Sequence, residues 1–153
     1  MTSAMTYTIQ NIKRYFALTE LVGSEVAARY GELAWAFLDH RLLDVILWLR
    51  EGLGIPLVCN TAALQQRGLR TNLSPIVQEK TRAGRMYLSA HCLGKGVDLS
   101  SSKMSAKDMR KWIRQHIDEC PHPIRIEGDK SAPTWLHIDV MNITDNKLVI
   151  FEV

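Results

Sequence analysis

The segment SAHCLGKGVD, residues 89–98, places a histidine and an aspartate on either side of two glycines. The residues around them have the pattern of β-strands, and Gly94 and Gly96 supply the permissive backbone of a tight turn or bulge. We therefore expect His91 to end one strand and Asp98 to lie on the next. A tight connection of this kind brings an imidazole and a carboxylate toward a common point.

Hydrophobic periodicity and turn residues around this segment predict helices first and mostly strands afterwards. A helix is expected over residues 32–50, a second begins at Pro75 behind Ser74, and a third follows Ser105, with Asp108 completing an approximate capping box. The expected strands cover residues 55–60, 85–91, 94–100, 123–128, 134–143 and 147–153. This order predicts an α+β fold, with N-terminal helices packed on a mainly antiparallel sheet.

Size and composition restrict the class of protein. The chain has 153 residues, 46% of them hydrophobic, and we expect one domain over residues 1–153 that is a monomer. No apolar run approaches the roughly 18 residues of a membrane span, and the polar N-terminus lacks the apolar core of a signal peptide, which predicts synthesis in a cytoplasm.

The 19 basic and 16 acidic residues are scattered, so a nucleic-acid partner is not expected. Cys59, Cys92 and Cys120 have no CxxC spacing and are expected to be free thiols.

A third side chain joins His91 and Asp98 as a candidate metal ligand. Catalytic zinc sites use three protein ligands and one water, and imidazole and carboxylate are typical ligands. His137 lies among apolar residues of TWLHIDV, where a histidine without a partner would be costly. We therefore predict a zinc site at His91, Asp98 and His137.

The segments SAHCLGKGVD and WLH together resemble a known signature. They are similar to the SxHxxGxxxD and WxH motifs of the M15 peptidases, which are zinc D-alanyl-D-alanine carboxypeptidases and related phage endolysins. QRGLRTN upstream resembles the family's arginine-to-asparagine segment, and the N-terminal part looks like the small helical lead of prophage-encoded members. The residues that match the two motifs are Ser89, His91, Gly94, Asp98, Trp135 and His137.

This resemblance implies a zinc-dependent peptidase that cleaves peptidoglycan stem peptides, of the D-Ala-D-Ala carboxypeptidase or L-Ala-D-Glu endopeptidase type. It implies a phage or prophage protein that reaches the cell wall by holin-assisted release or as part of a virion. Zinc would be held in a shallow groove over the sheet, and Arg67, with Arg70 as the alternative, would steady the oxyanion or the terminal carboxylate. The implied substrate contacts are Ser89, Arg70, Asn72 and Trp135.

The chain departs from the family at the general base. Many members carry a glutamate three residues before the last histidine, where this chain has Thr134. Asp139 faces the same side of a strand as His137 and would either act as the base or orient the histidine. Glu127 and His122 are further candidates. The alternative function is a catalytically inactive peptidoglycan-binding relative or a structural component of a virion.

Overall fold

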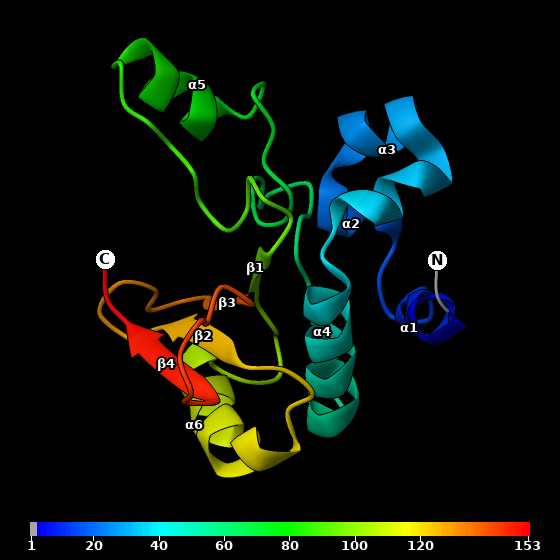
Figure 1. The fold of residues 1–153 in the computed structure, drawn as a ribbon, viewed down its shortest axis with the longest axis vertical. Coiled ribbons are helices and arrows are strands. Elements are labelled where there is room, and N and C mark those ends of the chain that lie inside the picture. The colour runs from blue at the N-terminus through cyan, green and yellow to red at the C-terminus, as the bar shows by residue number, and fades with distance from the viewer. Residues whose placement is uncertain (1–2) are drawn as a thin grey trace.

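The computed structural model describes residues 3–153 and confirms the α+β class (Figure 1). The α-helices are α1 (Ser3–Ile12), α2 (Leu18–Val22), α3 (Ser24–Tyr30), α4 (His40–Leu53), α5 (Pro75–Arg82) and α6 (Ala106–His116), with 3-10 turns at Gly31–Phe37 and Ile117–Glu119. The strands are β1 (Gly96–Leu99), β2 (Ile124–Glu127), β3 (Leu136–Asp139) and β4 (Leu148–Phe151). In Figure 1 helices α1 to α4 gather on one side, the sheet and α6 on the other, and α5 stands apart from both.

The four strands form one sheet in the order β1-β3-β2-β4. Strand β3 pairs antiparallel with β1 and with β2, as predicted, whereas β2 and β4 pair in parallel. The sheet is therefore mainly antiparallel, with one parallel pair at its edge.

Alternation along the strands gives the sheet two different faces. Val97, Ile126 and Ile138 belong to one buried apolar cluster, which also contains Met109 and Ile113 of α6. Helix α6 packs against β3, so it covers this apolar face. Asp98, His137 and Asp139 alternate with the core residues and lie on the other face.

The N-terminal helices share the same core as the sheet. Helix α1 packs on α4, and Ile12, Leu42 and Ile46 join Val97 and Ile138 in a continuous buried cluster. The predicted helix over 32–50 is wrong in its first part, which is a 3-10 turn. Helix α4 begins only at His40, because the Asp39 side chain caps it by accepting a hydrogen bond from the Arg41 backbone N–H.

Two predicted strands are absent from the sheet. Within residues 55–60 only Val58 pairs, in an isolated bridge to Ser100. Residues 85–91 are irregular and end in a turn, in which the Cys92 amide donates to the carbonyl of Ser89 and the Lys95 amide donates to that of Ala90. His91 therefore lies in a turn before β1 rather than at the end of a strand.

The other predicted elements are present, although the strands predicted over 94–100, 134–143 and 147–153 are shorter and cover Gly96–Leu99, Leu136–Asp139 and Leu148–Phe151. Helix α5 begins at Pro75 after Ser74, and the Ser105 side chain accepts from the Asp108 N–H at the start of α6. None of the described helices combines the length and apolar character that a membrane crossing requires.

Candidate metal centre

His91, Asp98 and His137 come together in the fold, as the sequence predicted. One donor atom from each residue lies within 4.8 Å of the others, and all three side chains are buried. The turn supplies His91, β1 supplies Asp98, and β3 supplies His137 directly opposite Asp98 in the register. The cluster therefore has the residue types and the spacing to hold a metal ion.

The turn that carries His91 depends on Gly94. This glycine has a φ of 66°, and a Cβ there would clash with the backbone carbonyl of Phe37. Its own carbonyl accepts a hydrogen bond of 2.8 Å from the Asp39 N–H, so the turn is fastened to the start of α4. Gly96 is also confined, because a Cβ there would lie 3.3 Å from Cε1 of His137.

We expect Gly94→Ala to destabilise the fold more than Gly84→Ala, by about 1–3 kcal/mol. The two glycines have nearly the same positive φ, but a Cβ on Gly84 would meet nothing within 4 Å. The backbone cost of the positive φ is therefore common to both variants, and their difference in denaturant-induced unfolding isolates the clash with Phe37. Equal free energies of unfolding would show that the turn can move away from α4.

The hydrogen bond of His91 to the backbone defines the state of its ring. Nδ1 lies 2.9 Å from the carbonyl oxygen of Gly68, which can only accept, so Nδ1 carries a hydrogen. Nε2 then faces Oδ1 of Asp98 at 3.3 Å. In a neutral ring this pair would be two acceptors, and either a proton on Nε2 or a metal cation between the two atoms resolves the conflict.

His137 lies between two carboxylates. Its Nδ1 is 2.9 Å from Oδ1 of Asp98, and its Nε2 is 2.9 Å from Oδ2 of Asp139. Burial lowers the pKa of His137, but the hydrogen bonds to Asp139 and Asp98 outweigh burial and raise it to about 9. Burial raises the pKa of Asp98, but hydrogen bonds from His137 and His91 hold it well below its usual range. Without a metal, the cluster is thus a buried ion pair.

Asp139 is fully buried, and both of its carboxylate oxygens accept hydrogen bonds from other residues of the chain. Arg125 donates to its two oxygens at 2.9 and 3.0 Å, and the Met141 N–H donates to Oδ1 at 2.9 Å. Burial raises the pKa of Asp139, whereas hydrogen bonds from His137 and Arg125 lower it further than burial raises it. Of the two roles left open by the sequence, this geometry favours orientation of His137 through Nε2.

The two candidate arginines differ in how they are held. Arg70 donates to the Gln66 carbonyl at 2.9 Å and to the Tyr87 hydroxyl at 2.6 Å, and it lies 3.6 Å from Oδ2 of Asp98. Arg67 lies over the ring of Trp135, 5.3 Å from its centroid. Its Nη1 is buried and has no hydrogen-bond partner among the described residues. Arg67 therefore has a donor that no described residue engages, and the residue lines the smaller neighbouring pocket.

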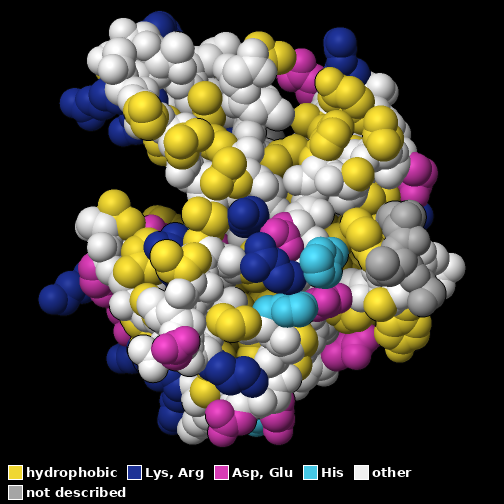
Figure 2. Space-filling model, viewed as in Figure 1, with side chains coloured by type: hydrophobic (Ala, Val, Ile, Leu, Met, Phe, Trp, Pro, Cys, Tyr) yellow, Lys and Arg dark blue, Asp and Glu magenta, His cyan; other side chains and the backbone are white. Residues whose placement is uncertain are grey.

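A cavity of about 380 Å³ opens beside the cluster. It is bounded by the segment after α5 on one side and by the ends of β2 and β4 on the other. A neighbouring pocket of about 230 Å³ shares Arg70, Asp98 and Trp135 with it and adds Arg67. Figure 2 shows the outline of the molecule notched between the α5 region and the sheet region, with hydrophobic side chains along the notch. The cavity is lined by all three cluster residues and by Arg70, Tyr87, Leu88, Ser89, Ala90, Arg125, Glu127, Trp135, Met141, Phe151 and Val153.

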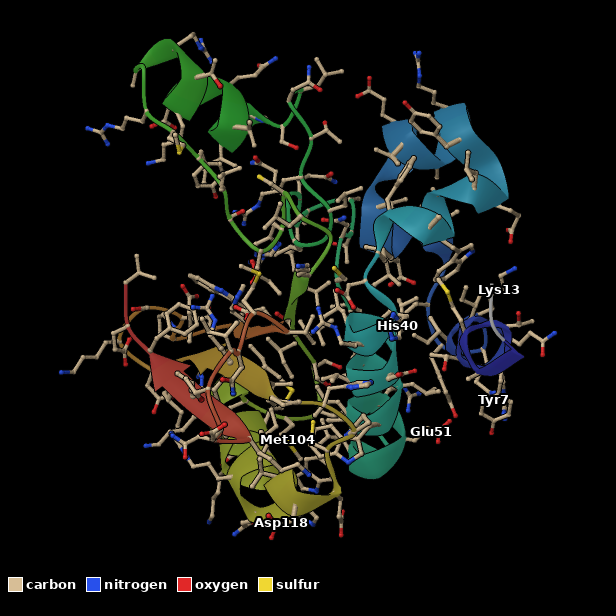
Figure 3. The ribbon with its side chains drawn as sticks, viewed as in Figure 1. Tyr7, Lys13, His40, Glu51, Met104 and Asp118 are labelled. Atoms are coloured by element: carbon tan, nitrogen blue, oxygen red, sulfur yellow. The ribbon has the colours of Figure 1, made fainter. Side chains whose placement is uncertain are left out.

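Some predicted residues lie elsewhere. Asn72 is exposed and lines a separate pocket with Arg70 and Tyr87. Thr134 is exposed and does not line the cavity. His122 binds Asp44 of α4 at 2.7 Å, near His40, which Figure 3 labels at the start of that helix.

Arg125 and Tyr87 line the cavity but were not predicted from the sequence. Arg125 alternates with Glu127 in the strand PIRIEG, and this alternation was the available signal for two polar side chains on the cavity face. Tyr87 gave no such signal, because its segment is irregular.

Comparison with known proteins finds no similar protein. No protein-family model, curated protein or solved structure matches this chain. Support for a function therefore comes from the residues of this chain and from their geometry.

Proposed function

We propose that this protein is a zinc-dependent peptidase that cleaves peptidoglycan stem peptides. The observation that supports the proposal best is the convergence of His91, Asp98 and His137 at the wall of a cavity. Two imidazole nitrogens and one carboxylate oxygen form a donor set typical of catalytic zinc, which leaves a fourth position for water. The peptidoglycan substrate, of the D-Ala-D-Ala or L-Ala-D-Glu type, follows from the resemblance of SAHCLGKGVD and WLH to the M15 signature.

The residues around the cluster fit this chemistry. Zinc, when bound, supplies Lewis-acid polarisation of the scissile carbonyl and activates water at neutral pH. Asp139 holds the Nε2–H of His137 and so leaves Nδ1 as its ligand atom. Arg67 lines the neighbouring pocket, where its guanidinium would contact the developing oxyanion or a terminal carboxylate. Ser89 and Trp135 line the same cavity and would contact the peptide.

The proposed site of action is the bacterial cell wall. A phage or prophage protein of this kind would reach the wall by holin-assisted release or as part of a virion. The chain's weak positive charge favours loose association with an anionic polymer.

One observation favours a second candidate function. Thr134 occupies the position at which many M15 peptidases carry the glutamate that acts as general base, and a threonine cannot accept a proton at neutral pH. The second candidate is therefore a peptidoglycan-binding relative, without hydrolysis, that acts as a structural component of a virion.

Hydrolysis of purified stem peptides, followed by mass spectrometry, distinguishes the two. We expect cleavage at one peptide bond in the zinc-loaded protein, loss of cleavage after chelation, and recovery when zinc is added back. A zinc-loaded protein that binds stem peptides and leaves them intact would instead identify the binding function.

Arg67→Ala is expected to lower turnover of a stem peptide by about ten- to a thousandfold, the usual effect of losing one oxyanion or carboxylate contact. Zinc content should not change, because the variant keeps the Arg67 backbone carbonyl that accepts from the Asp98 N–H, and among residues 3–153 no hydrogen bond or ion pair joins the Arg67 side chain to the cluster. Arg85→Ala, which alters an exposed arginine just after α5, is the matched control and should keep full turnover. If Arg70→Ala abolishes turnover with zinc retained while Arg67→Ala has no effect, Arg70 holds the substrate oxygen.

A further inference from the structure

A second carboxylate, Glu127, lies on the cavity face of the sheet next to the cluster. Strands β2 and β3 pair Arg125 with Asp139 and Ile126 with Ile138. Continuing this antiparallel register by one residue places Glu127 opposite His137. Side chains directly opposite each other share a face, with Cβ atoms about 4.5–5.5 Å apart.

The row across the sheet is therefore Asp98, His137 and Glu127. Asp98 is paired with His137 on the other side of β3, and both residues line the same cavity as Glu127. Glu127 thus comes from a third strand and lines the same cavity as the cluster without belonging to it.

The backbone of Glu127 is fixed while its carboxylate is free. Its carbonyl accepts a 2.7 Å hydrogen bond from Nε of Arg110, and the residue pairs with Phe151 of β4. Among residues 3–153, no hydrogen bond or ion pair engages its side-chain carboxylate, and the residue is only half-buried. A carboxylate in this condition can accept a proton from a water in the cavity.

The other two candidates for this role are placed less well. Asp139 is fully buried and is bound by Arg125, His137 and the Met141 N–H. His122 lies 2.7 Å from a carboxylate oxygen of Asp44 in α4 and does not line the cavity.

We infer that Glu127 is the general base of the peptide hydrolysis, an inference that rests on the proposed function. Water attacks the scissile carbonyl carbon while Glu127 takes one of its protons. The C–N bond then breaks as Glu127 gives that proton to the leaving amine nitrogen. One water is consumed, one carboxylic acid and one amine are formed, and Glu127 returns to its starting state.

The test is stem-peptide hydrolysis by Glu127→Gln at saturating zinc, with zinc content and melting temperature measured on the same sample. We expect a rate loss of about a hundred- to ten-thousandfold, the usual contribution of a general base, with one zinc retained and the melting temperature unchanged. Glu119→Gln, an exposed glutamate of the 3-10 turn after α6, is the matched control and should keep the wild-type rate.

Asp139→Asn tests whether Asp139 acts as the base or only orients the His137 ring. This variant should bind zinc about ten- to a hundredfold more weakly and should recover most of its rate when zinc is saturating.

Three outcomes would overturn the inference. A loss of less than about a hundredfold in Glu127→Gln would exclude the base role while leaving the peptidase intact. Loss of zinc from the same variant would make Glu127 a ligand instead. A zinc-loaded wild type that cleaves no stem peptide would refute the proposed function itself, and the inference with it.

Discussion

Zinc is expected to raise the melting temperature of the wild-type protein, and Asp98→Asn is expected to abolish this rise. Metal that binds only the folded chain stabilises it, by about 4 kcal/mol at a thousandfold excess over Kd. For a domain of this size that corresponds to an increase of about 8–16 °C. Asp98 supplies the anionic oxygen that both imidazoles face, so its loss removes the centre of the site.

His91→Gln and His137→Gln should behave in the same way, each with peptide hydrolysis lost together with zinc. His122→Gln is the matched control, because His122 also pairs with an aspartate but lies outside the cluster. Metal analysis and differential scanning calorimetry with and without zinc measure the two effects. A wild type that contains no zinc and shows no thermal shift would identify the cluster as a purely structural ion pair.

Arg110→Met is expected to destabilise the protein by about 3 kcal/mol or more, because three backbone carbonyl oxygens lose a charged donor at about 1–3 kcal/mol each. Arg110 lies on α6 and is fully buried. It donates to the backbone carbonyls of Glu127, Ala132 and Trp135 and pairs with Asp129. Methionine fills a similar volume but leaves three carbonyl oxygens without their donor.

Arg114→Met, one turn further along α6 and exposed, is the control and should change stability by less than about 0.5 kcal/mol. Urea unfolding monitored by circular dichroism compares the two variants. Equal midpoints would mean that water replaces the guanidinium, so that Arg110 adds little to the fold.

Local sequence patterns predicted the metal cluster. The spacing in SAHCLGKGVD and the apolar surroundings of His137 suggested His91, Asp98 and His137 as candidates, and the resemblance to the M15 motifs joined them into one predicted site, which the structure brings together. The same holds for the N-termini of α5 and α6, because a proline at the first helical position and a serine cap each depend on a few consecutive residues. Ser105 caps α6 through its side chain, whereas the side chain of Ser74 makes no capping hydrogen bond to α5.

Features that depend on distant partners could not be predicted. Arg110 interrupts an apolar stripe on α6 and reads as a solvated residue, because the carbonyls that it binds follow much later in the chain. The parallel pairing of β2 with β4 and the absence of residues 85–91 from the sheet are likewise set by tertiary contacts that no periodicity records. Of the partners of Asp139, only Arg125 is distant in the chain, and its two hydrogen bonds help to favour one of the two possible roles of Asp139.

The alternation of polar and apolar side chains in β1 and β3 also limits how chain length can vary. One residue inserted within Val97–Leu99 or Leu136–Ile138 would turn a ligand toward the core and an aliphatic side chain toward the cavity. An insertion in residues 100–105, between β1 and α6, would leave both registers unchanged. Homologous chains that keep this centre should therefore vary in length in that loop, and deletions that cross either strand should remove the metal site and the core together.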